Sequence, residues 1–249
     1  GKAVLLCDNS PVALVVPGAF NSFMESSEDW YHRFEMASFL LLLRYLAVLM
    51  TTILPGLYLA VIRFHTQVLP TNLILSFAEA REGVPFSSVV ELIFLELSFE
   101  LIREAGVRIP GSLGNAIGIV GGLVIGQAAV EANLVSPIVV MIVALTALGS
   151  MTVPNEEFAA AFRLVKYGFL ILGGYLGIYG IVLGVYLVIG HLAGLISFGI
   201  PYLVPFIKKE QKGSRGEGVL RVPLRKRVLR PLYAREEQKI RLKRKESGS

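Results

Sequence analysis

Residues 112–132 read SLGNAIGIVGGLVIGQAAVEA, and Glu131 is the one charged side chain among them. Glycine recurs at every fourth position of this segment, at Gly114, Gly118, Gly122 and Gly126. In a helix these glycines share one face and leave a groove in which another backbone can pack closely, as in membrane helices. The segment is long enough to cross about 30 Å of hydrocarbon. We therefore predict a membrane-spanning helix here.

Three strongly polar side chains interrupt this apolar segment: Asn115, Gln127 and Glu131. Polar groups are unfavourable against lipid and usually face protein or water. Two interpretations stay open. These side chains lie either at a helix end that reaches the lipid headgroups or along a water-filled pore.

Outward from this segment, three further apolar stretches predict membrane spans. Residues 38–62 contain Pro55, which predicts a kink, and Arg44, which should face protein or water. Residues 137–153 begin at a proline, a residue suited to the first helical position. Residues 159–196 are longer than one bilayer crossing needs. They form either one long tilted helix or a hairpin that turns near 190–194, and we predict a single helix.

An acidic helix is predicted over residues 87–105. Three of its carboxylates recur at every fourth position and share one face: Glu96, Glu100 and Glu104. One interpretation is a helix at the membrane interface, in which Glu100 pairs with Arg103 and Glu104 pairs with Arg108. The other is an acidic stripe that faces a water-filled vestibule and attracts cations.

The chain is 54% hydrophobic and only 17% charged, whereas soluble domains average about 25% charged residues. We predict an all-α polytopic membrane protein with about four transmembrane helices plus interfacial amphipathic helices. Residues 1–37 are expected to be the end of a truncated soluble N-terminal domain, with a short β-hairpin remnant over residues 2–20. Residues 38–207 form the helical membrane domain, and residues 208–249 a basic, disordered tail.

Charge is divided unevenly along the chain. Residues 1–207 hold nine Lys/Arg and fourteen Asp/Glu, whereas residues 208–249 hold fifteen Lys/Arg and five Asp/Glu. A dense basic segment directly after a span predicts a cytoplasmic C-terminus and favours anionic membrane lipid. An even number of four spans then places both termini in the cytoplasm. Nucleic acid is excluded as a partner, because no folded binding module accompanies the basic residues.

Enzyme motifs are absent from the sequence. There is no P-loop, no HExxH and no GxSxG, and the three histidines are dispersed. A single cysteine, Cys7, excludes an internal disulfide framework and a cysteine-based zinc site. We therefore expect no catalytic residue, no metal site and no cofactor. The expected chemistry is packing, conduction or signalling.

A longer signature surrounds the glycine-rich segment. Residues 98–137 read SFELIREAGVRIPGSLGNAIGIVGGLVIGQAAVEANLVSP, residues 54–86 read LPGLYLAVIRFHTQVLPTNLILSFAEAREGVPF, and residues 191–206 read HLAGLISFGIPYLVPF. This pattern resembles the GerA family of spore germination proteins, in particular the A-type subunit or its SpoVAF-like paralogue. The resemblance covers roughly residues 1–210.

The resemblance implies a multi-pass subunit of a germinant receptor complex in the spore inner membrane. Its expected partners are B- and C-type subunits, membrane lipid and monovalent cations, which would pass through an oligomeric channel opened by small nutrients. We expect a homo-oligomer with the 112–132 helix nearest the axis and Glu131 repeated as a ring. The alternatives are a secondary transporter, although the internal repeats typical of transporters are not found, and a non-conducting scaffold.

Overall fold

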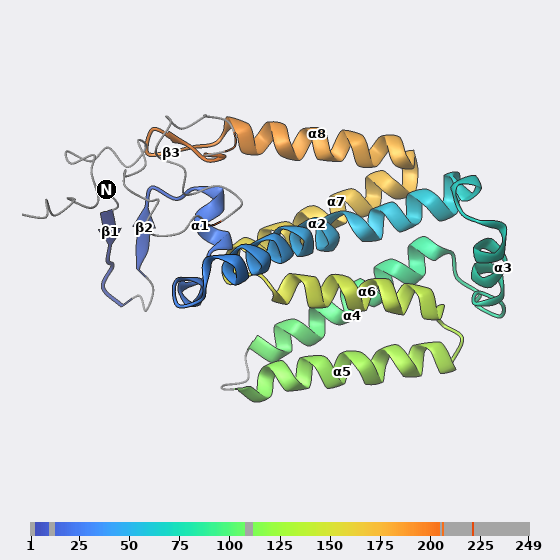
Figure 1. The fold of residues 1–249 in the computed structure, drawn as a ribbon. Coiled ribbons are helices and arrows are strands. Elements are labelled where there is room, and N and C mark those ends of the chain that lie inside the picture. Colours follow the sequence, from blue (N-terminus) through green and yellow to red (C-terminus); the bar gives the residue numbers. More distant parts are fainter. Residues whose placement is uncertain (1–2, 10–12, 108–111, 205, 207–220, 222–249) are drawn as a thin grey trace, which may run out of the picture. The chain divides into compact units, whose positions relative to one another are not determined.

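Helices make up most of the part of the chain that the structure describes. The structure is a computed structural model that describes residues 3–9, 13–107, 112–204, 206 and 221, without the side chains of 107, 112–117, 119 and 123. The elements, labelled in Figure 1, are β1 (Ala3–Leu5), β2 (Leu14–Val16), α1 (Phe20–Met24), η1 (Ser27–Trp30), α2 (Phe34–Phe64), η2 (Thr66–Val68), α3 (Thr71–Glu79), α4 (Ser88–Val107), α5 (Ser112–Glu131), α6 (Pro137–Met151), α7 (Glu156–Leu176), α8 (Ile178–Gly194), β3 (Ile196–Ser197) and β4 (Ile200–Pro201).

The chain divides into two compact units. The first contains the described residues of Gly1–Leu46, Val153–Asn155 and Tyr186–Ser249, and the second contains those of Ala47–Thr152 and Glu156–Val185. In the first unit β1 and β2 pair antiparallel, with Ala3 opposite Val16. Both strands are largely exposed. That they belong to a larger soluble domain stays a prediction.

Arg44 finds its partner within the first unit. One guanidinium nitrogen donates to Asp29 Oδ2 at 2.6 Å, and the other donates to Asp29 Oδ1 at 3.0 Å. Burial alone raises the pKa of Asp29, but the bonds from Arg44 and from the Ser26 amide outweigh it and hold that pKa below its usual value. The sequence predicted that Arg44 faces either protein or water. The structure confirms this prediction, because Arg44 faces protein.

One residue of the basic tail, Arg221, is described and lies against the first unit. Its guanidinium carbon is 4.2 Å from the centre of the Trp30 ring, and it donates to Glu25 Oε2 at 3.0 Å. Its backbone amide donates to Ser38 Oγ at 3.0 Å. The rest of the predicted disordered tail lies outside the described residues.

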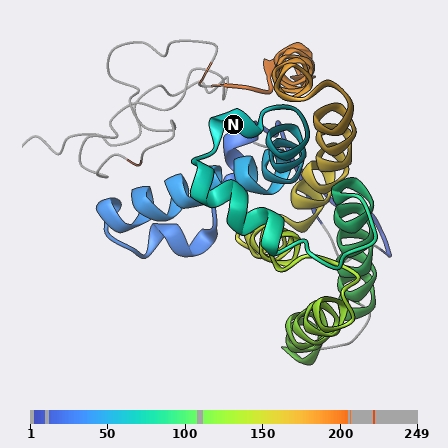
Figure 2. The same cartoon turned by 90° about the vertical axis from the view of Figure 1, so that its right-hand side faces the viewer.

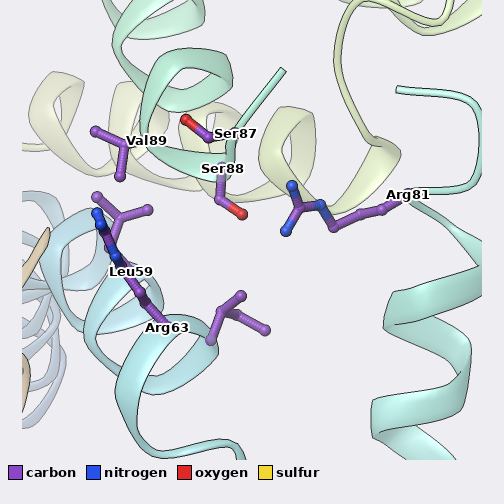
Figure 3. Close-up of a pocket in the computed structure, with 7 residues that line it drawn as sticks. Leu59, Arg63, Arg81, Ser87, Ser88 and Val89 are labelled. Atoms are coloured by element: carbon purple, nitrogen blue, oxygen red, sulfur yellow. The ribbon is translucent and has the colours of Figure 1, made fainter. Parts of the chain in front are cut away.

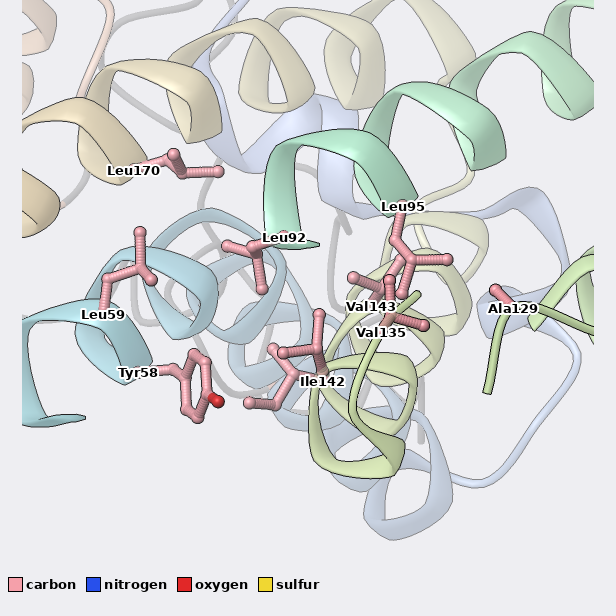
Figure 4. Close-up of a cluster of buried hydrophobic side chains, with 10 residues drawn as sticks. Tyr58, Leu59, Leu92, Leu95, Ala129, Val135, Ile142, Val143 and Leu170 are labelled. Atoms are coloured by element: carbon pink, nitrogen blue, oxygen red, sulfur yellow. The ribbon is translucent and has the colours of Figure 1, made fainter. Parts of the chain in front are cut away.

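The second unit is a bundle in which α4, α5, α6 and α7 run alternately in opposite directions (Figures 1 and 2). Its core contains side chains from five helices and from the loop between α5 and α6 (Figure 4): Tyr58, Leu59, Leu92, Leu95, Ala129, Val135, Val139, Ile142, Val143 and Leu170. Helix α4 packs along α5 and α6. One face of the acidic helix α4 therefore belongs to the core of the bundle.

Two glycines allow α2 and α7 to touch backbone to backbone. A Cβ atom on Gly173 would lie 2.3 Å from the carbonyl oxygen of Gly56, and a Cβ atom on Gly56 would lie 2.4 Å from the carbonyl oxygen of Phe169. Real Cβ atoms do not approach backbone this closely, so no other residue fits without a shift of a helix. Gly56 lies next to Pro55, the proline predicted within the first span.

The prediction of one helix over residues 159–196 is wrong. The stretch is split into α7 and α8 at Gly177, whose φ of 64° is in the left-handed region that favours glycine. The two helices then pack closely, because Cβ atoms on Gly180 and Gly184 would lie 2.1 Å from Leu172 and 2.8 Å from Phe169. The alternative, a helical hairpin, correctly gives two helices in this stretch. Its turn, however, lies at Gly177 and not near residues 190–194.

Candidate functional site

The acidic face of α4 meets the two basic side chains of α7. Glu96 and Lys166 form a salt bridge in which the side chains are 2% and 4% exposed. Thr146 of α6 donates its hydroxyl to Glu96 Oε1 at 3.2 Å. A buried charge is strongly unfavourable without a partner, so this pair ties α4, α6 and α7 together.

One turn further along α4, Glu100 joins a second, less buried group of charges. Arg163 of α7 donates its Nε to Glu100 Oε1 at 3.0 Å, and Arg103 lies 3.7 Å from Glu100 Oε2. Arg103 also donates to the Ala147 carbonyl of α6 at 3.4 Å. The side chain of Glu100 is 35% exposed, so this group lies at the surface of the unit rather than in its core.

The predicted acidic stripe therefore does not form one open surface in the structure. Glu96 is buried and neutralised, Glu100 is shared between two arginines, and Glu104 is exposed. The predicted local pair of Glu100 with Arg103 is present in the structure. Arg108, the predicted partner of Glu104, lies outside the described residues. A vestibule lined by all three carboxylates conflicts with the burial of Glu96.

Sequence reasoning missed Arg163 and Lys166 as the partners of this stripe. A signal was available, because they are the only Lys/Arg residues between positions 109 and 207. A charge inside an apolar segment normally faces the bundle interior and pairs there. Their spacing of three also places them on one face of α7, as the spacing of four places Glu96 and Glu100 on one face of α4.

Two of the glycines that share one face of α5 pack against other helices of the same chain. A Cβ atom on Gly122 would lie 2.8 Å from Phe99 of α4, and one on Gly126 would lie 3.1 Å from Val140 of α6. At Gly118 nothing among the described atoms lies within 4 Å. At these two positions the glycine face of α5 therefore packs against α4 and α6. The surroundings of Gly114 and the side chain of Asn115 lie outside the described residues.

The opposite face of α5 is exposed. Val120 and Val124 are each 59% exposed, and Gln127 and Glu131 follow on the same face. Gln127 donates its side-chain amide to Glu131 Oε1 at 3.0 Å. Two of the three polar side chains predicted for this segment therefore lie together, beside two exposed valines.

Among the described residues, two helices are long and apolar enough to span a membrane, and three shorter helices are also apolar. Phe34–Phe64 and Glu156–Leu176 are long and apolar enough to cross a membrane, judged by length and composition. Shorter apolar helices are Val120–Glu131, Pro137–Met151 and Ile178–Gly194. Within the described residues, no three His, Cys, Asp or Glu side chains are close enough together to hold a metal ion.

Comparison with known proteins identifies relatives along nearly the whole chain. A family model described as the Bacillus/Clostridium GerA spore germination protein matches residues 1–233. The chain is 41% identical to spore germination protein KA of Bacillus subtilis (strain 168), over 97% of this chain and 44% of that protein. For spore germination protein B1 of the same strain, the identity is 40%, over 97% of this chain and 50% of that protein.

A third relative, the uncharacterized membrane protein YfkQ of Bacillus subtilis (strain 168), is 43% identical over 85% of this chain and 42% of that protein. The chain spans about half the length of these curated relatives. No solved structure matches it.

Proposed function

Because the chain belongs to the GerA family of spore germination proteins, we propose that it is a membrane subunit of a germinant receptor complex. In this proposal it lies in the spore inner membrane and works with B- and C-type subunits. Several copies assemble into a cation channel that opens during germination. The names of its relatives, several of which are spore germination proteins, support the first part of this proposal.

The exposed face of α5 carries the channel part of the proposal. Val120, Val124, Gln127 and Glu131 face away from the subunit, whereas Gly122 and Gly126 hold the helix in place behind them. Around a symmetry axis, such a face becomes the lining of a pore. Two valines on each copy form an apolar constriction, which can close a pore by excluding water. Glu131 repeats as a ring of carboxylates, which favours cations.

The charge pairing within the second unit supports a larger number of crossings than four. Helix α4 has 20 residues, long enough to cross a bilayer, and its buried carboxylate is neutralised by α7. With α4 included, the crossing helices are α2, α4, α5, α6, α7 and α8. The number stays even, so both ends of the chain remain on the cytoplasmic face, as the basic tail requires.

This orientation predicts which side of the membrane each end of α2 reaches. Cys7 precedes α2, is exposed, and is the one cysteine of the chain. We expect a membrane-impermeant maleimide to label Cys7 in inverted vesicles and not in right-side-out vesicles. In the double variant Cys7→Ser/Glu82→Cys the label should be reversed, because the exposed Glu82 lies between α3 and α4. Labelling of both positions from one side would contradict the proposed crossings.

The pore proposal is tested by ion flux through the full chain reconstituted in liposomes. Changing Glu131→Gln removes a ring of charge and is expected to lower the permeability ratio of cations over anions roughly fivefold. That factor corresponds to about 1 kcal/mol, the interaction of two unit charges about 4 Å apart in water. The matched control is Glu104→Gln, which removes an exposed carboxylate from α4 and should leave the ratio unchanged.

The valine constriction is tested in the same assay. Val124→Ala is expected to raise the resting flux, since a smaller side chain leaves the closed pore wetter. Unchanged selectivity in Glu131→Gln together with altered selectivity in Glu104→Gln would place the pore along α4 instead of α5. A purified oligomer that carries no flux under any stimulus would favour the scaffold alternative.

A further inference from the structure

A pocket of about 440 Å³ lies in the second unit, where the end of α2 meets the beginning of α4 (Figure 3). Small-molecule sites in proteins commonly measure about 300–1,000 Å³. Three aliphatic side chains form the apolar part of its wall: Leu59, Ile62 and Val89. Two arginines and two serines form the polar part: Arg63, Arg81, Ser87 and Ser88. The pocket is therefore large enough for a small molecule and has both an apolar and a cationic side.

The charge of this pocket is not balanced by the carboxylates around it. Arg81 donates to Glu91 Oε1 at 3.1 Å, so its charge is largely compensated. Arg63 donates to the Gly174 carbonyl at 3.3 Å, and none of the described carboxylates lies within 4 Å of it. One net positive charge therefore remains at the pocket.

The two serines add donors beside these guanidinium groups. Ser87 and Ser88 stand at the start of α4, a helix of 20 residues, where the first backbone amides have no partner within the helix. Hydroxyl groups, free amides and guanidinium groups are together the usual ligands of carboxylate and phosphate oxygens. Glu91 cannot supply the anionic group that these donors would bind. Its second carboxylate oxygen already accepts a hydrogen bond from the Ser136 amide at 2.8 Å, on the side of α6.

We propose that this pocket binds an oxyanion, a carboxylate or phosphate group, with Arg63 as its main partner. The aliphatic side chains take the carbon chain next to the anionic group. This chemistry has two natural sources. One is a free small molecule with a single anionic group, and the other is the phosphate of an anionic lipid, since the pocket lies at the ends of α2 and α4 where lipid headgroups are expected.

The test uses the purified full chain in non-ionic detergent and measures its thermal unfolding midpoint. The probes are inorganic phosphate, butyrate, and mixed micelles that contain phosphatidylglycerol or, as a neutral reference, phosphatidylcholine. At about one hundred times its dissociation constant, a bound probe should raise the midpoint by about 5–10 °C. A saturable rise with phosphate or butyrate identifies a free anion, whereas a rise with phosphatidylglycerol alone identifies a lipid headgroup.

Two variants connect any rise to this pocket. Arg63→Gln should lower the affinity for the probe that raises the midpoint about tenfold or more, as the loss of a charge-assisted hydrogen bond does. The matched control Arg33→Gln removes an arginine that is 89% exposed and should behave like the unchanged chain.

A second variant, Ser87→Asp, distinguishes loss of binding from failure to fold. An acidic residue at the start of a helix is stabilising, so this variant should unfold at or above the normal midpoint while its carboxylate occupies the pocket and abolishes the rise. The proposal is overturned if no probe raises the midpoint, or if Arg63→Gln and Ser87→Asp respond like the unchanged chain. Neither result depends on whether the protein conducts ions.

Discussion

Replacement of Lys166 by Met is expected to lower the free energy of unfolding of this protein by about 3–5 kcal/mol, the usual loss when one partner of a buried ion pair is removed. Glu96 is 2% exposed and would be left with only the Thr146 hydroxyl, a much weaker partner than an ammonium group. The measurement is thermal or denaturant unfolding of the full chain in detergent, followed by its helical circular dichroism.

A double variant separates the loss of a partner from the loss of a side chain. Glu96→Gln combined with Lys166→Met removes both charges and should recover most of the stability, because no unpaired charge stays buried. Arg163→Gln is the comparison on the same helix. Its pair with Glu100 is partly exposed, so we expect a loss below about 1 kcal/mol. Equal losses for Lys166→Met and Arg163→Gln would show that the Glu96 pair is not buried as described.

The second large effect is expected at the contact of α2 with α7. Gly173→Ala should lower the free energy of unfolding by about 3 kcal/mol, at the upper end of the usual range for an overpacked core. The added methyl group would lie 2.3 Å from the Gly56 carbonyl oxygen, and backbone cannot move aside as a side chain can. The two helices would have to separate, which loosens the packing of Leu59 and Leu170 in the core.

Gly168→Ala is the matched control for this prediction. Gly168 lies on the same helix, is exposed, and has no described atom within 4 Å of the added methyl group. Alanine is favoured over glycine in a helix by about 1 kcal/mol, so this variant should be unchanged or slightly more stable. The two variants add the same atoms and are expected to act in opposite directions. A loss in both would point to the helix itself rather than to its contact with α2.

Most helix positions were predictable from the sequence, because they depend on local properties of the chain. The span predicted over 38–62 lies within Phe34–Phe64, and the segment predicted over 112–132 forms Ser112–Glu131. A run of apolar residues must satisfy its backbone hydrogen bonds internally when it is removed from water, and a helix does so within one segment. Ser136 followed by Pro137 likewise marks the start of α6 through the fixed φ of proline.

The break at Gly177 was not predictable in the same way. Gly173, Gly177 and Gly180 all lie in one apolar stretch, and each can adopt a positive φ at little cost. What selects Gly177 is the packing after the turn, which requires glycine at Gly180 and Gly184 opposite α7 and at Gly173 opposite α2. These contacts join residues on different helices, and local sequence contains no information about which helices meet.

Sequence by itself therefore determined the family of the protein, the approximate limits of most helices and the residues that carry charge within them. Tertiary structure alone decided which of those residues are buried in contacts within the chain and which are exposed on its surface. It buried Glu96 against Lys166, turned Gly122 and Gly126 inward against α4 and α6, and left Gln127 and Glu131 on the outer face of α5. The reason is that helix formation depends on neighbours along the chain, whereas the direction of a helix face depends on the other helices packed around it.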